Sequence, residues 1–396
     1  MKRNSPALAD RLAELDRGLL RRRRRVLSTA RRAGEWPSVA VDGERAVDFC
    51  SNDYLGLARH PDIAAAMARA ALRHGAGSGA SHLVSGHGHE HAALEEELAA
   101  FTGRERALLF STGYMANLAV IGAFADRTTH VILDRLSHAS LIDATILSRA
   151  RLKRFVHADA AAAQRLLVAA GDAAALVATD GVFSMDGDCA PLPELARVCR
   201  AHDAWFMVDD AHGLGVLGAR GRGTLEHYAL DEAAVPLLVG TLGKAFGTFG
   251  AFAAGPADVI ELLLQRARSY AYTTALPQPV AAATREALRI AARESWRRER
   301  VLQLARRFAI AAAELNVPLL PSQTPIQPVL LGSAARVLRA QERLLRAGFW
   351  VVAIRPPTVP PGTARLRIAL SAAHREDQVD ALVEELAHIC IGFTHE

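Results

Sequence analysis

The alternation of short apolar runs with longer amphipathic runs is the feature that most restricts the fold of this chain. The apolar runs occupy residues 107–110, 130–134, 174–180, 204–210 and 236–242. Several of the segments between them have the spacing of apolar residues that is typical of an amphipathic helix. Strands that are apolar along their whole length favour a parallel or mixed sheet with both faces covered. We therefore predict an α/β fold around such a sheet.

The flanking regions differ from this pattern. Leucines at helical intervals predict one helix over residues 5–32, and composition changes after the "LPQP" break at 276–279. The remainder combines long helix-forming stretches with three short strands, which indicates a smaller α+β domain. We predict an N-terminal helical segment over 1–45, a large domain over 46–278 and a small C-terminal domain over 279–396.

Composition excludes several classes of protein. With 51% hydrophobic and 22% charged residues, the 396-residue chain has the balance of a globular protein. Its apolar runs are too short to span a bilayer, and the N-terminus lacks the apolar core of a secretory signal. We expect a cytoplasmic protein without a membrane partner, and the four cysteines lack metal-ligand spacing.

The positive charge is concentrated in five consecutive arginines at 21–25. Such a run is often a solvated helix face, and it also suits an acidic small-molecule substrate. A nucleic-acid site would need stacking aromatics or a recognisable module beside the charge. Aromatic residues are only 6% of the chain, so we predict no nucleic-acid partner.

Polar side chains follow several of the predicted strands. In an open α/β sheet, ligands bind beyond the carboxyl ends of the strands. Gly113 and Tyr114, in "STGYMAN", open a helix whose N-terminus suits a phosphate, although a plain capping turn gives the same pattern. Asp209, in "MVDDAHG", could hold a metal, orient a histidine or pair with a ring nitrogen. His138, in "LSHAS", stands past another strand, where packing or helix capping is common.

The run "HGHEHAALEEE" contains His87, His89 and His91. His87 and His91 stand four residues apart, which is a spacing found in metal sites. No further ligand is evident in the sequence, and the run opens an amphipathic helix. We predict no metal and leave the role of these histidines open.

Lys244, in "GTLGKAFG", is one of only three lysines among 47 basic residues. A phosphate-binding P-loop is excluded because Leu238 stands where it needs a glycine and Ala245 where it needs serine or threonine. A lysine can attack a carbonyl to form a Schiff base, whereas a guanidinium cannot. Together with a phosphate-binding helix start and a strand-end aspartate, this lysine predicts a pyridoxal 5'-phosphate enzyme.

The stretches "SNDYLGLA", "GSGASHLVSG", "LLFSTGYMAN", "VDDAHGLGVLG" and "GTLGKAFG" resemble the α-oxoamine synthases, a family of fold-type-I pyridoxal-phosphate-dependent transferases. The resemblance covers nearly the whole chain. It implies a homodimer with shared active sites that condenses an amino acid with an acyl thioester and releases carbon dioxide and the thiol. "TPIQPVLLG" and "AIRPPTVPPGTARLRIALSAAH" are most similar to members that use L-alanine and a pimeloyl thioester, carried by CoA or by acyl carrier protein. Members that join glycine to acetyl-CoA or succinyl-CoA, or serine to a fatty acyl-CoA, are the alternatives.

The resemblance also implies roles for the candidate catalytic residues. Lys244 corresponds to the Schiff-base lysine, which also moves the α-proton of the amino acid. Asp209 corresponds to the partner of the pyridine nitrogen, and His138 to the residue that stacks on the ring. His212 and Ser184 correspond to the contacts of the phenolic oxygen.

The phosphate and substrate positions follow in the same way. The implied phosphate site comprises Gly113, Tyr114 and Thr241, with Thr273 and Thr274 reaching the phosphate of the neighbouring subunit. Arg367 corresponds to the clamp for the amino-acid carboxylate, which a guanidinium fork suits. The substrate region is further lined by His138, Asn52, Thr358 and an N-terminal arginine, for which we choose Arg23 over its two neighbours.

Overall fold

The computed structural model describes residues 5–29 and 37–394, which belong to two compact units. The larger unit comprises Asp53–Ser184 and Asp188–Glu299. The smaller unit comprises Met1–Asn52, Met185–Gly187 and Arg300–Glu396. The domain limits predicted from the sequence, 1–45, 46–278 and 279–396, are not tested by this division and stay a prediction.

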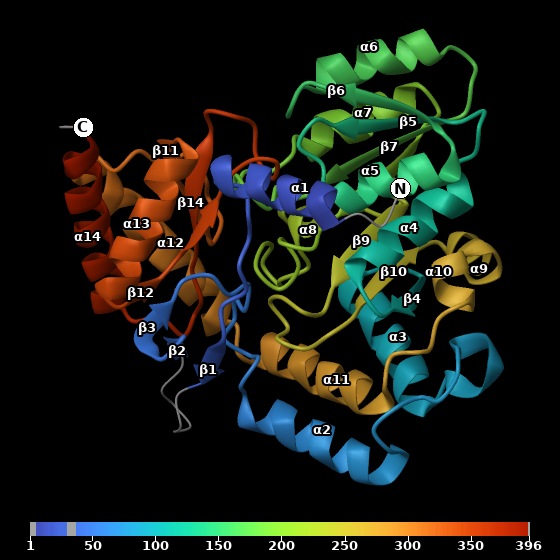
Figure 1. Cartoon of the computed structure of the whole chain (residues 1–396). Coiled ribbons are helices and arrows are strands. Elements are labelled where there is room, and N and C mark those ends of the chain that lie inside the picture. The colour runs from blue at the N-terminus through green and yellow to red at the C-terminus, as the bar shows by residue number, and fades with distance from the viewer. Residues whose placement is uncertain (1–4, 30–36, 395–396) are drawn as a thin grey trace. The chain divides into compact units, whose positions relative to one another are not determined.

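A seven-stranded sheet forms the centre of the larger unit (Figure 1). Strand β10 pairs antiparallel with both of its neighbours, and every other pairing is parallel. The mixed sheet with a parallel majority confirms the fold predicted from the continuous apolar strands. In spatial order the strands are β4 (Arg106–Phe110), β10 (Ala251–Gly255), β9 (Leu237–Thr241), β8 (Trp205–Asp209), β7 (Ala175–Asp180), β5 (His130–Asp134) and β6 (Arg151–Phe155).

Both faces of this sheet are covered, because alternate side chains of each strand enter different cores. On β7, Leu176 and Ala178 pack on one side, whereas Val177 packs on the other. Helices α4 (Gly113–Phe124), α5 (Ala139–Ser148) and α9 (Ala257–Arg266) supply the first core. Helices α6 (Ala160–Ala170) and α7 (Leu192–Ala201) supply the second.

Further helices complete the larger unit. Helix α11 packs against α2 and α3 (Figure 1). The bounds are α2 (Pro61–His74), the π-helical turn η1 (His82–Gly86), α3 (His89–Thr102), α8 (Thr224–His227), α10 (Arg268–Ala271) and α11 (Gln278–Arg293). Helix α12 (Trp296–Glu314) begins here and continues into the smaller unit.

The smaller unit contains two sheets and their helices. One sheet has the order β1 (Leu27–Thr29), β2 (Ser38–Val41), β3 (Glu44–Asp48) and β12 (Phe349–Trp350). The other has the order β11 (Ile326–Gly332), β14 (Ala364–Ala369) and β13 (Val352–Ile354). Helices α13 (Ala334–Arg346) and α14 (Glu376–Thr394) pack against each other.

The helix predicted over residues 5–32 is shorter than expected. Helix α1 (Ser5–Arg17) ends before Leu19, whose φ of 54° does not continue a right-handed helix. The arginines at 21–25 follow in an irregular segment, and strand β1 comes next. The arginine run is therefore not a helix face, and residues 30–36 lie outside the described part of the chain.

None of the helices in the two described ranges combines the length and the apolar character that a membrane crossing needs.

Candidate active site

Lys244 lies in the loop that follows β9, in contact with a histidine. Its Nζ is 2.8 Å from Nε2 of His212, which follows β8. The other ring nitrogen of His212, Nδ1, is 2.7 Å from the hydroxyl of Tyr54, and Tyr54 is fully buried. Because each imidazole nitrogen has a fixed neighbour, the ring is held in one orientation beside the lysine amine.

The backbone of the lysine loop rests against the start of the larger unit. Gly247 has a φ of +66°, and a Cβ added there would lie 2.3 Å from the backbone nitrogen of Ala58. The Ala58 segment is itself fixed, since the carboxylate of Asp53 accepts hydrogen bonds from the amides of Leu57 at 2.7 Å and Ala58 at 3.0 Å. A glycine is required at 247 because only glycine combines this conformation with this close approach.

Asp209 and the exposed His138 belong to one hydrogen-bonded network whose centre is buried. Nδ2 of Asn117 lies 2.7 Å from both Oδ2 of Asp209 and Oγ of Ser140, and the same Oγ is 2.7 Å from Nδ1 of His138. Asn117 and Ser140 are both fully buried. Our reading of the sequence missed these two positioning residues. A buried amide in the otherwise apolar stretch "YMANLAVIGAF" was the available signal, because buried polar groups need partners.

Asp180, at the end of β7, connects the same residues electrostatically. Its Oδ2 accepts a hydrogen bond of 2.9 Å from the backbone amide of His138. Burial raises the pKa of Asp180 well above its ordinary value, and the negative charge of Asp209 adds to this effect. The hydrogen bond from His138 and the positive charge of Lys244 act in the opposite direction. The charges of both Lys244 and Asp209 therefore influence the pKa of the Asp180 carboxyl.

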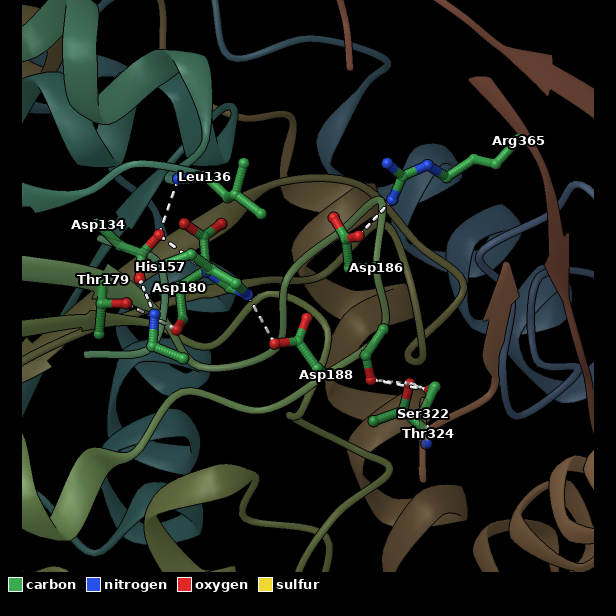
Figure 2. A network of polar contacts seen from close by, with 12 residues as sticks. Asp134, Leu136, His157, Thr179, Asp180, Asp186, Asp188, Ser322, Thr324 and Arg365 are labelled. Atoms are coloured by element: carbon green, nitrogen blue, oxygen red, sulfur yellow. Dashed lines mark hydrogen bonds and ion pairs between the residues drawn. The ribbon is translucent and has the colours of Figure 1, made fainter. Parts of the chain in front are cut away.

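A second polar network lies at the neighbouring strand ends (Figure 2). His157 contacts Oδ1 of Asp134 at 3.0 Å through Nδ1 and Oδ2 of Asp188 at 2.8 Å through Nε2. Burial alone would lower the pKa of His157, but the hydrogen bonds and charges of both carboxylates outweigh it and raise the pKa to about 10. The ring also packs edge-on against Phe183, the residue before Ser184. The charged His157 thus links Asp134 on β5 to Asp188 in the loop that carries Ser184.

The predicted phosphate residues surround the start of α4. Oγ1 of Thr112 caps this helix by accepting the amide of Met115 at 3.2 Å, so the capping alternative is correct for Thr112. A Cβ added to Gly113 would meet no atom within 4 Å, so space lies open at this helix N-terminus. Thr241 ends β9 and donates a hydrogen bond of 3.1 Å to the carbonyl of Gly250. The Thr112 hydroxyl caps the helix by accepting one amide, and a phosphate would occupy the open space beside Gly113. Capping and phosphate binding are therefore compatible at this helix N-terminus.

The positions of the remaining predicted residues of the larger unit are less enclosed. Tyr114 is 40% exposed, and its hydroxyl donates to the carboxylate of Asp143. Ser184 is half-buried at the end of the larger unit's first segment. Thr273 is half-buried and Thr274 is exposed in the segment between α10 and α11.

The smaller unit holds the other predicted substrate residues. Arg367, on β14, is buried and donates a hydrogen bond of 3.0 Å to Oδ1 of Asn52. Its neighbour Arg365 is also buried and pairs with Asp186 (Figure 2). Near the surface, Arg22 donates a hydrogen bond of 2.7 Å to Oγ1 of Thr358.

The residues of the larger unit fit pyridoxal phosphate. They provide an amine beside an imidazole, a buried carboxylate that can pair with a pyridinium, and an open helix N-terminus for a phosphate. Together these groups match the cofactor's aldehyde, ring nitrogen and phosphate. The fold and this site define a fold-type-I pyridoxal-phosphate-dependent transferase.

Comparisons with known proteins identify the family. A family model described as aminotransferase class I and II matches residues 44–386. The 8-amino-7-oxononanoate synthase of Thioalkalivibrio sulfidiphilus is 58% identical over 379 residues, which cover 95% of this chain and 97% of that protein. The enzyme of the same name from Methylococcus capsulatus is 61% identical over 349 residues, which cover 88% and 90% of the two chains.

A solved structure is also similar. A serine palmitoyltransferase variant from S. paucimobilis, with a bound PLP–myriocin aldimine, superposes with a TM-score of 0.92 at 30% identity and covers 99% of this chain and 98% of its own. The chain belongs to the 8-amino-7-oxononanoate synthases, within the aminotransferase class I and II family. It is a pyridoxal-phosphate-dependent acyltransferase of biotin biosynthesis, and the sister synthases considered from the sequence are not favoured.

Proposed function

We propose that the residues around Lys244 carry out the decarboxylative condensation of L-alanine with a pimeloyl thioester, which yields 8-amino-7-oxononanoate, carbon dioxide and the free thiol. The observation that carries this assignment is the contact of 2.8 Å between Nζ of Lys244 and Nε2 of His212. A lysine amine held beside an imidazole has a nearby group with which to exchange a proton. Pyridoxal phosphate, when bound, supplies the electron sink for the charge that develops on the alanine α-carbon.

In this proposal each side chain of the site has a separate task. Lys244 would hold the cofactor covalently, and its amine would move the α-proton of alanine. Asp209 keeps the ring nitrogen protonated, and its position is set by the hydrogen bond from Asn117. His138 stacks on the ring, and Ser140 and Asp180 fix its side chain and backbone. His212 and Ser184 orient the ring through its phenolic oxygen.

The phosphate site is proposed at the N-terminus of α4, where Gly113 and Tyr114 present backbone amides and Thr241 a hydroxyl. Thr273 and Thr274 would complete the corresponding site of a second copy of this chain. Their exposed or half-buried positions support this part of the proposal. It requires a homodimer with shared active sites.

Substrate recognition is proposed for the smaller unit. The guanidinium of Arg367 binds the alanine carboxylate, with Asn52 holding its orientation through the hydrogen bond of 3.0 Å. Thr358 and an N-terminal arginine contact the acyl substrate. Arg23 remains our choice for that arginine, although the bond from Arg22 to Thr358 makes Arg22 its direct rival.

The acyl carrier is proposed to be an acidic carrier protein, because arginines 21–25 are exposed and basic. A cytoplasmic location is part of the same proposal, since both the carrier and the biosynthetic route would be found there.

The decisive experiment uses the cofactor-loaded protein. Borohydride reduction should fix the cofactor to Lys244, as read by mass spectrometry of the labelled peptide. L-Alanine with pimeloyl-CoA should give product faster than glycine or serine does. A label on another residue, or a preference for glycine or serine, would refute the assignment.

A further inference from the structure

Three histidines of the larger unit lie close together in space. All three are far from Lys244 in the sequence. One ring nitrogen from each of His82, His87 and His91 lies within 4.8 Å of one from each of the others. His82 and His91 are buried, and the side chain of His87 is 32% exposed. The turn η1 brings His82 to the histidine pair whose spacing the sequence had singled out.

The orientation of the three rings is defined by their neighbours. Nδ1 of His82 is 3.0 Å from Nδ1 of His87. Nε2 of His91 donates to the carbonyl of Leu276, so Nδ1 of His91 carries the lone pair. Nε2 of His87 is 4.0 Å from Oε2 of Glu95. In metal sites the outer nitrogen of a ligating histidine usually donates to a carbonyl or a carboxylate. His91 already has this arrangement, and the carboxylate of Glu95 lies near Nε2 of His87 but beyond hydrogen-bond distance.

Burial disfavours the charged form of all three imidazoles. Burial lowers the pKa of His82 to about 3, and the neighbouring His91 and His87 add to this effect. Burial likewise lowers the pKa of His87 and of His91. Neutral histidines offer a lone pair, whereas imidazolium ions would repel a cation.

We propose that His82, His87 and His91 bind one transition-metal ion of the Zn²⁺ class through their Nδ1 atoms. Imidazole is a preferred ligand of zinc, copper and nickel, and three histidines leave a fourth position for water. The ion displaces the proton between His82 and His87 and ties η1 to the first turn of α3.

Binding requires one local exchange of hydrogen bonds. The amide of Gly88 now donates to Nδ1 of His91 at 2.9 Å and would have to release it. Another acceptor is close, because a Cβ added to Gly88 would lie 2.3 Å from Oε1 of Gln278. That oxygen is buried and has no hydrogen-bond partner within the described ranges. The ion would therefore replace one neutral hydrogen bond of the Gly88 amide, and Oε1 of Gln278 is the nearby acceptor without a partner in the described part of the chain.

The test uses the cofactor-loaded protein after removal of metal by a chelator. Calorimetric titration with Zn²⁺ should show one tightly bound ion per chain, and Co²⁺ should give the visible absorption of a nitrogen-rich site. His87→Gln should weaken Zn²⁺ binding at least about 100-fold. Glu95→Gln should weaken it about 10- to 100-fold, as loss of an outer-shell partner does.

His89→Gln is the matched control, because His89 is exposed in the same run and lies outside the cluster. Its affinity should equal that of the unmodified protein. Since His87 is partly exposed, its variant should fold, as unchanged cofactor absorbance would verify. Equal affinities of the unmodified protein and His87→Gln, or an equal loss in His89→Gln, would overturn the proposal.

Discussion

The lysine region of the larger unit and the arginine region of the smaller unit are built differently. Around Lys244, the imidazole of His212 and the hydroxyl of Tyr54 form a continuous chain of contacts, and both residues are buried. Arginines 21–25 are exposed, and their contacts go to surface groups such as Asp42 and Thr358. Positions fixed by several buried partners suit the reacting atoms, whereas exposed side chains suit a flexible acyl chain or its carrier. Substitutions should therefore lower kcat in the first region and raise KM in the second.

Lys244→Ala tests the first region with the largest expected effect. Without the amine, no covalent link to the cofactor forms, and kcat should fall about 10⁴-fold or more, as it does when a nucleophile is removed. Product formation from L-alanine and pimeloyl-CoA measures the loss. Lys153→Ala, at an exposed position on β6, is the control and should keep full activity.

Asp209→Asn should lower kcat about 100- to 1,000-fold, because a neutral amide does not hold the proton on the ring nitrogen. The hydrogen bond from Asn117 can persist, since the new side chain keeps one oxygen. Steady-state kinetics and the cofactor absorption spectrum are the measurements. A loss below tenfold with a normal spectrum would remove Asp209 from the proposed role.

Arg367→Lys examines the buried part of the smaller unit. A lysine keeps the charge but loses the bidentate geometry, so KM for L-alanine should rise about 10- to 100-fold. KM for pimeloyl-CoA should change little and serves as the internal control. An equal rise in both constants would mean that Arg367 supports the fold rather than the carboxylate.

His157→Gln tests whether the charge of His157 stabilises the fold, because the loss of stability should then depend on pH. The folded-state pKa of about 10 lies above the ordinary value of 6.5. The interaction of charged His157 with Asp134 and Asp188 therefore stabilises the folded protein fully below about pH 6.5 and loses this effect as pH rises toward 10. The variant should lose roughly 2 kcal/mol of unfolding free energy at pH 6. Urea unfolding at pH 6 and pH 10 should show the difference shrinking. A loss of stability that is independent of pH would contradict the stabilising charge of His157.

Reversal of charge in the arginine run should give the smallest effect. Arg22→Glu with Arg24→Glu should raise KM for a pimeloyl carrier protein about 3- to 10-fold, with a smaller rise for pimeloyl-CoA. Arg11→Glu, on the exposed surface of α1, controls for net charge. Equal effects on both substrates would reject the carrier-protein proposal. Single changes of Arg22 and Arg23 to alanine, compared on pimeloyl-CoA, would decide between these two candidates.

The sequence predicted the sheet well because its strands are apolar along their whole length, and only a two-sided core explains that pattern. It also singled out Lys244 and Asp209 as candidates, since their chemical types are restrictive and one follows β9 while the other ends β8, and their roles stay a prediction. Tyr54 was quoted in a motif but given no role, because its contact with His212 joins residues 158 positions apart. The helix predicted over 5–32 was wrong over residues 18–29, where the positive φ of Leu19 was not evident from residue type.

The close approach of Gly247 to Ala58 has a consequence for variation of the sequence. Lys244, the proposed Schiff-base residue, is three positions away, yet the backbone path of its loop depends on the absence of a side chain at 247. In a library randomised across residues 243–248, functional clones should retain glycine at 247 almost as strictly as lysine at 244. Two codons three positions apart would thus be restricted for unrelated reasons, one by the proposed chemistry and one by volume.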